Sequence, residues 1–176
     1  MAKRVSKKPD WLNVAKVVDV YSVSSCVSAA FADYIKYWKH NGYWLFDSPA
    51  AIETLAQNNS IELSGTKLFY YEVYENEFLE HKHEWHSFSP ESSFATNVVV
   101  PKEKYLDGYD VVTFSCGNNP ECSPLSCNSL AAELRTNQHC LLGFFEEAKQ
   151  YLENGNFDYS EPGPYRIFAV YSLKGP

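Results

Sequence analysis

The sequence predicts a single α+β domain, with a mainly antiparallel sheet of five or six strands and three helices packed against it. Several short segments alternate apolar and polar residues, which is typical of half-buried strands. Other segments repeat apolar residues at three- and four-residue steps, the spacing of one helix face. The expected strands occur in runs interrupted by helices, and this order favours an α+β fold over a doubly wound parallel sheet.

The first half of the chain is expected to contain two strands and two helices. Residues 13–23 are rich in valine, which favours a strand. Residues 24–44 carry apolar side chains at helical spacing. Ser48 and Pro49 are typical first residues of a second helix, because the serine can cap it and proline has no N–H to leave unpaired. Residues 66–78 alternate in character with neither face wholly apolar, which suits an antiparallel strand.

The rest of the chain is expected to contain four strands and one helix. The strands are short and bounded by turn residues, including the pair Asp107-Gly108. The helix has glutamates in its first turn, where the helix dipole favours negative charge. The expected strands cover residues 84–88, 94–100, 109–116 and 165–173, and the helix covers residues 143–154.

The charge of the chain is unevenly distributed, and this limits the partners that it can bind. Residues 1–10 are expected to form a flexible basic tail, and residues 11–176 the globular domain. Because the formal net charge is −7 and the first eight residues contribute +4, the rest of the chain carries −11. A body this acidic repels phosphate backbones, so nucleic acid is not an expected partner.

The expected compartment follows from what the sequence lacks. No apolar run approaches the ~20 residues that a membrane span requires, so no membrane association is expected. The basic residues at the start are not followed by the apolar stretch of a signal peptide. Five cysteines without an export signal indicate reduced thiols and a cytoplasmic location.

A cluster of cysteines is the first candidate for chemistry. Thiolate and imidazole are preferred zinc ligands, and four of them can form a tetrahedral site. The spacing argues against zinc, because structural sites use ligand pairs separated by two to four residues. No metal or other cofactor is therefore expected, and the alternative is that the cysteines pack as small hydrophobic residues. The candidate ligands are Cys116, Cys122, Cys127, His139 and Cys140.

The same segment could instead hold a catalytic cysteine. Catalysis needs a thiol whose pKa is lowered by a histidine or by a helix N-terminus. Cys122, Cys127 and His139 are the candidates, although the chain has no Cys-His signature of a known enzyme class. Phosphate-binding and serine-hydrolase motifs are absent as well, which favours a non-catalytic protein.

The series His81, His83 and His86 is a further candidate. In an extended chain, residues 81 and 83 share one face and residue 86 points to the other. Only a distorted turn could gather all three around a transition metal. The alternative is a set of exposed histidines at the tip of a hairpin.

Aromatic residues make up 16% of the chain, while methionine occurs once. Tyrosine and tryptophan bury a ring and keep a polar tip in water, which is typical of binding surfaces. The alternative is that most of these rings fill the core. The candidate binding residues are Tyr43, Trp44, Tyr70, Tyr74 and Trp85.

Two segments carry a resemblance to other sequences. At PECSPLSCNSL, residues 120–130, and at EPGPYRIFAVYS, residues 161–172, the chain resembles an uncharacterised bacterial family of hypothetical proteins of similar length. The resemblance implies no activity, cofactor or site residue.

The acidic body, the many tyrosines and tryptophans and the lack of a catalytic signature predict a small binding or regulatory protein with a protein partner. The alternative is a cysteine-dependent enzyme or metal-binding protein that uses residues 116–140.

Overall fold

The computed structural model describes residues 2–4, 6–24, 45–88, 98–115 and 120–174. The strands are β1 (Ala2–Arg4), β2 (Ser6–Lys7), β3 (Asp19–Val20), β4 (Thr66–Leu79), β5 (Glu84–Ser87), β6 (Lys104–Thr113) and β7 (Tyr165–Leu173). The helices are α2 (Pro49–Asn58), α3 (Pro124–Cys127) and α4 (Phe145–Glu153), and residues Leu130–Ala132 form a 3₁₀ turn. The helix expected over residues 24–44 lies outside the described residues.

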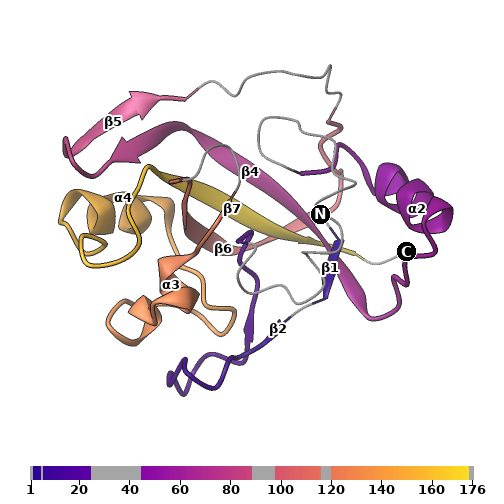
Figure 1. Cartoon of the computed structure of the whole chain (residues 1–176), viewed down its shortest axis with the longest axis horizontal. Helices are drawn as coiled ribbons and strands as arrows, with labels where there is room; N and C mark the ends of the chain where they lie inside the picture. Colours follow the sequence, from indigo (N-terminus) through magenta and orange to yellow (C-terminus); the bar gives the residue numbers. More distant parts are fainter. Residues whose placement is uncertain (1, 5, 25–44, 89–97, 116–119, 175–176) are drawn as a thin grey trace.

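The main sheet has five strands in the order β1-β4-β7-β6, and β5 pairs with the far end of β4. Every pairing is antiparallel, and β2 and β3 form a separate two-stranded ribbon. Figure 1 shows β4 and β7 side by side through the centre, with α4 toward one end and α2 at the other. The α+β prediction is therefore confirmed, with a strand count at the lower end of the expected range.

Local sequence signals placed several elements correctly. The Ser48 hydroxyl accepts a hydrogen bond from the Ala51 N–H at 3.2 Å and caps α2 as expected. The strands β4 and β7 and the helix α4 have nearly the predicted bounds. A turn at residues 80–83 joins β4 to β5, and His83 adopts a left-handed backbone there, with φ of 55°.

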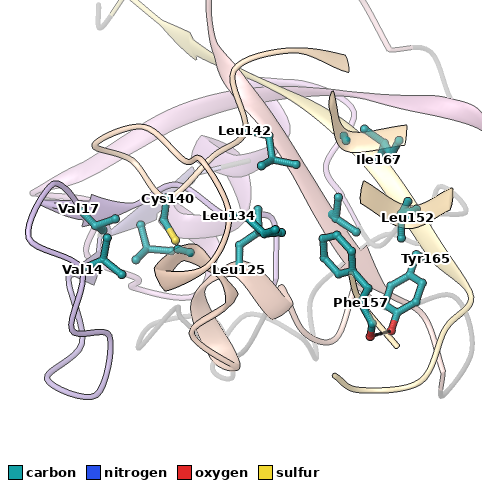
Figure 2. Packing of buried hydrophobic residues seen from close by; sticks show 14 of the residues in the cluster. Val14, Val17, Leu125, Leu134, Cys140, Leu142, Leu152, Phe157, Tyr165 and Ile167 are labelled. Carbon is teal, nitrogen blue, oxygen red and sulfur yellow. Dashed lines mark hydrogen bonds between the residues drawn. The ribbon is translucent and has the colours of Figure 1, made fainter. Parts of the chain in front are cut away.

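Two hydrophobic clusters lie on opposite faces of the sheet. One includes Val111 and Ile167 from the strands and Leu152 from α4. Figure 2 shows Phe157 and Tyr165, of the same cluster, next to each other and near Leu152. The other is built on β4, β6 and β7 and covered by the segment around Tyr21. We call the face that packs on α4 the α4 face. Its fully buried residues include Phe78, Val111, Leu142, Leu152, Phe157, Tyr165 and Ile167.

The valine-rich segment 13–23 is mostly not a strand, contrary to the prediction. Only Asp19–Val20 pair regularly, with β2. The segment is instead held by backbone hydrogen bonds to a distant loop, from the Val18 N–H to the Gln138 carbonyl and from the Tyr21 N–H to the His139 carbonyl. Four of its five valines are buried and Val18 is 65% exposed, so packing rather than strand pairing accounts for most of the valine content.

The predicted strand at residues 94–100 is not observed in its described part, since residues 98–100 have no regular structure and are exposed. Residues 94–97 lie outside the described part of the chain. In the basic segment at the N-terminus, β1 pairs with the start of β4 and β2 pairs with β3. The boundary between a tail and the globular domain stays a prediction.

The predicted turn at Asp107-Gly108 is wrong, because both residues lie inside β6. The pairing of β6 with β7 shifts there, from Leu106 opposite Tyr171 to Gly108 opposite Val170. One extra residue on β6 makes this a β-bulge. Gly108 has φ of +147°, which a residue with a side chain rarely adopts. The glycine that suggested a turn therefore allows the bulge.

Candidate binding pocket on the α4 face

An open pocket of about 310 Å³ lies on the α4 face, where the sheet extends beyond α4. Five of its lining residues are polar or aromatic groups that could contact a ligand. The pocket is lined by Glu72, Val73 and Tyr74 of β4, Tyr109 of β6, Phe145 of α4, and Ile167, Ala169 and Tyr171 of β7.

The bulge in β6 places Lys104 and Tyr109 on the same face of the sheet. Side chains alternate between faces along a regular strand, so an even-numbered and an odd-numbered residue of β6 would point in opposite directions. Lys104 pairs with Leu173 before the bulge, and Tyr109 pairs with Ala169 after it. Because directly paired residues share a face, the extra residue places Lys104 and Tyr109 on the same side.

A second irregularity of strand pairing occurs in β4, which also borders the pocket. The register against β7 shifts between Val73, opposite Phe168, and Glu77, opposite Arg166. Tyr74 lies in this irregular stretch and lines the pocket. The two breaks in the ladder therefore flank the pocket, in keeping with the frequent occurrence of bulges next to functional sites.

Aromatic rings form the walls of the pocket. The centroid of the Phe145 ring lies 4.8 Å from that of Tyr74, edge to face, and 6.0 Å from that of Tyr109. Trp85 supports Tyr74 from behind at 5.6 Å, and its indole N–H donates to the Glu153 carboxylate at 2.7 Å. These contacts fix the walls, because offset and edge-to-face ring pairs have preferred geometries.

Four residues at the edge of the pocket form what we call the lysine box: Tyr70, Glu72, Lys104 and Tyr171. The Tyr171 hydroxyl donates to the Glu72 carboxylate at 2.8 Å, and the Lys104 ammonium donates to the other carboxylate oxygen. The same ammonium lies 4.2 Å from the centroid of the Tyr171 ring and 4.8 Å from that of Tyr70. The box thus encloses a cation between two rings and a carboxylate.

The pKa values in the lysine box show how its groups depend on one another. Burial, together with the hydrogen bond to Glu72 and the charge of Glu72, raises the pKa of Tyr171 to about 12. Burial by itself would raise the pKa of Glu72, but hydrogen bonds from Lys104 and Tyr171 and the charge of Lys104 lower it below its usual value. Glu72 is therefore held as a carboxylate.

Two phenol groups in the pocket are available to a ligand. Within the described part of the chain, the hydroxyls of Tyr74 and Tyr109 have no hydrogen-bond partner in the protein. Each can donate one hydrogen bond and accept another. The pocket therefore combines apolar walls with two unused polar groups and one carboxylate, which is the usual composition of a ligand site.

The predicted binding residues differ in their distance from the pocket. Tyr74 lines the pocket, Tyr70 belongs to the lysine box, and Trp85 supports the wall without lining the pocket. Tyr43 and Trp44 lie outside the described residues. The sequence reasoning missed Tyr109, Phe145 and Tyr171. The alternation of residues 165–173 was a signal for Tyr171, but the strand pairing that brings it to Glu72 was not visible.

The cysteine-rich segment does not form a metal site among the described residues, where no group of three or more possible ligands converges. Cys122 and Cys140 are buried and Cys127 is half-buried, while Cys116 lies outside the described residues. The His139 Nδ1 atom lies 2.5 Å from the Asp19 carboxylate, and its ring stacks on Tyr21 with centroids 3.9 Å apart. The described contacts of the His139 ring thus involve the Asp19 carboxylate, the Tyr21 ring and the Gln138 amide, and none of them is with a thiol.

Cys140 is expected to resist alkylation in the folded protein. Burial raises the pKa of its thiol to about 12, and the negative charges of Asp110 and Cys127 contribute. At pH 8 only about one molecule in ten thousand would carry the reactive thiolate. Iodoacetamide at pH 8 followed by peptide mass spectrometry should leave Cys140 unmodified in native protein and modify it in 8 M urea. Rapid modification in native protein would contradict this assignment and support a reactive thiol.

Two of the three histidines of the hairpin contact different partners. The His83 Nε2 atom lies 2.6 Å from the Glu153 carbonyl of α4, and the His86 Nε2 atom lies 2.7 Å from the Glu84 carboxylate. They belong to no group of three or more candidate ligands in the described part of the chain. The contact of His83 instead links the hairpin to the end of α4.

Comparisons of the chain with family models, with curated proteins and with solved structures find no match. The resemblance to a bacterial family therefore stays a prediction. None of the helices in the described residues is both long and apolar enough to cross a membrane.

Proposed function

We propose that this protein is a non-catalytic binding protein that contacts another protein through the pocket on the α4 face. The observation that carries the proposal is an open pocket of about 310 Å³ with aromatic walls and two phenol groups that no described residue engages. Aromatic side chains with a wet polar tip dominate protein contact surfaces. Phe144, which precedes the lining residue Phe145 in sequence, is 72% exposed and presents an apolar ring to solvent.

The acidic charge and the thiols support the rest of the proposal. A formal net charge of −7 disfavours nucleic acid as the partner. Cys140 is a free, buried thiol, which fits a reducing, cytoplasmic compartment. The partner is expected to contact the aromatic walls with a side chain that enters the pocket.

Site-specific photocrosslinking tests this proposal. A photoreactive phenylalanine analogue replaces Phe144, next to the pocket, and in a control it replaces Tyr159, which is fully exposed. One discrete crosslinked species is expected at position 144 in cells and none of that mass at position 159. The blocking variant Ala169→Leu fills the pocket from its floor and should abolish the crosslink without large loss of stability, because Ala169 is only half-buried.

Three outcomes would contradict the proposal. Persistence of the crosslinked species in Ala169→Leu would show that the pocket is not used. Equal formation of the species at position 159 would show unselective contact. Absence of any discrete species at position 144, with the protein folded by circular dichroism, would also count against it.

A further inference from the structure

We propose that the pocket receives a basic side chain, a lysine ammonium of the partner, and that Lys104 is the internal cation with which this group competes. The inference rests on the proposed function and names the chemistry of the group that enters the pocket. It follows from the way the α4 face already holds an ammonium.

The lysine box shows that this surface accommodates a cation. The Lys104 ammonium lies within about 6 Å of two ring centroids, the range in which cation–π attraction acts. Glu72 supplies the opposite charge, and its side chain remains 41% exposed. A carboxylate has about four sites that accept hydrogen bonds, so Glu72 can receive a further donor beside Lys104 and Tyr171.

The adjoining pocket offers the same chemistry to a second ammonium. Its walls are the rings of Tyr74, Tyr109 and Phe145, and among the described residues Glu72 is the only charged one that lines it. The free phenol oxygens of Tyr74 and Tyr109 can accept hydrogen bonds from an ammonium, which is a donor only.

Charge outside the pocket favours the same occupant. The first turn of α4 carries Glu146 and Glu147 next to the lining residue Phe145. The chain as a whole carries a formal net charge of −7. An anionic group would meet these carboxylates, whereas a cation is attracted to them. A neutral ring would fill the pocket but leave Glu72 without a role.

Lys104 sets the affinity for an incoming cation. It neutralises Glu72 and repels a second positive charge nearby. Its backbone is fixed by pairing with Leu173, but its side chain is 22% exposed and can leave the box. Loss of the Lys104 charge should therefore strengthen cation binding, and loss of the Glu72 charge should weaken it.

A matched pair of small probes tests the inference. Tetramethylammonium carries the charge, and tert-butanol has similar size and shape without it. Protein with ¹³C-labelled tyrosine rings is titrated with each probe, and ring signals are assigned by the single variants Tyr74→Phe, Tyr109→Phe and Tyr171→Phe. Tetramethylammonium should shift these three signals saturably and leave Tyr159 unchanged, while tert-butanol should shift none of them.

Variants of the lysine box then test the roles of its charges. Cation–π and charge contributions of about 1 kcal/mol correspond to roughly five-fold in Kd. Glu72→Gln should weaken tetramethylammonium binding by about that factor, and Lys104→Gln should strengthen it by a similar factor. Lys104→Met serves as a second variant of similar length, and thermal melts verify that each variant is folded.

Several results would overturn the inference. Equal shifts from both probes would indicate an apolar site without charge selectivity, and no saturable shift from tetramethylammonium would exclude cation binding through the rings and the charge of Glu72. Weaker binding in Lys104→Gln would show that Lys104 does not compete. Any of these could occur while the pocket-dependent crosslink at position 144 persists, so failure here is distinguishable from failure of the proposed function.

Discussion

Replacing Asp110 with alanine is expected to lower the free energy of unfolding by about 3–5 kcal/mol, the range found when one partner of a buried charged network is removed. Asp110 lies in β6 and is fully buried. Its carboxylate accepts hydrogen bonds from the Ser22 hydroxyl at 2.5 Å, the Val23 N–H at 3.1 Å and the Ser123 hydroxyl at 2.6 Å. Alanine would remove the carboxylate acceptor that these three buried donors share.

The effect should be large because Asp110 joins segments that are distant in sequence. The Ser22 hydroxyl in turn accepts a hydrogen bond from the Ser24 N–H at 3.0 Å, and the Ser24 hydroxyl donates to the Glu121 carbonyl at 2.7 Å. Each unsatisfied buried group costs about 1–3 kcal/mol, so several lost partners together reach the expected range.

Urea denaturation at pH 7 measures the change. Asp110→Asn keeps one acceptor oxygen and should fall between wild type and Asp110→Ala. Asp10→Ala removes an exposed carboxylate and should change stability by less than about 0.5 kcal/mol. A cost below about 1 kcal/mol for Asp110→Ala would show that the network contributes little.

Those parts of the fold with local signals could be predicted from the sequence. The capping serine of α2, the glutamates that open α4 and the alternation of β4 each act within a few residues, and the structure contains all three elements. The valine-rich segment 13–23 was misread because burial of valines does not require a strand. Its backbone partners, Gln138 and His139, lie more than 100 residues away.

The position of Asp110 among apolar residues of β6 is a sequence signal for its burial. Along a regular strand, Asp110 shares a face with Val112, and a carboxylate on an apolar face must be hydrogen-bonded. The partners themselves, Ser22 and Ser123, could not be identified from spacing. The same limit applies to the cysteines, since burial sets the pKa of Cys140 and no interval between cysteines reports burial.

The pocket depends on strand register, which the sequence does not reveal. Tyr171 donates to Glu72 across 99 positions of sequence because β4 and β7 pair in one particular alignment. Lys104 joins them only because β6 contains a bulge. The prediction of a turn at Asp107-Gly108 correctly identified an unusual backbone there but assigned it to the end of a strand.

Gly108→Ala is accordingly expected to lower the free energy of unfolding by about 2–5 kcal/mol and to distort the pocket, through backbone strain of about 1–2 kcal/mol and overpacking of about 1–3 kcal/mol. A Cβ atom at Gly108 would lie 2.7 Å from the Leu142 carbonyl oxygen and 2.8 Å from the Leu141 Cβ. Real structures essentially never contain such contacts, and the Leu142 carbonyl cannot move freely because it accepts the Tyr109 N–H at 2.9 Å.

Gly65→Ala provides a matched control that separates strain from steric conflict. Gly65 also has a positive φ, +74°, but a Cβ atom there meets nothing within 4 Å. Gly65→Ala should lower the free energy of unfolding only by the strain contribution, about 1–2 kcal/mol. Urea denaturation of both variants measures the difference, which is attributable to the contact with Leu141 and Leu142.

The ring signals of Tyr109 and Tyr171 report what happens to the pocket. If the bulge is what places Lys104 and Tyr109 on one face, Gly108→Ala should move both signals and reduce tetramethylammonium binding, while Gly65→Ala should leave both unchanged. Equal stability losses in the two variants, with the pocket signals intact, would show that the bulge tolerates a side chain. The proposed dependence of the cation site on Gly108 would then be wrong. Lys104 and Tyr109 would share a face of β6 even without a glycine at position 108.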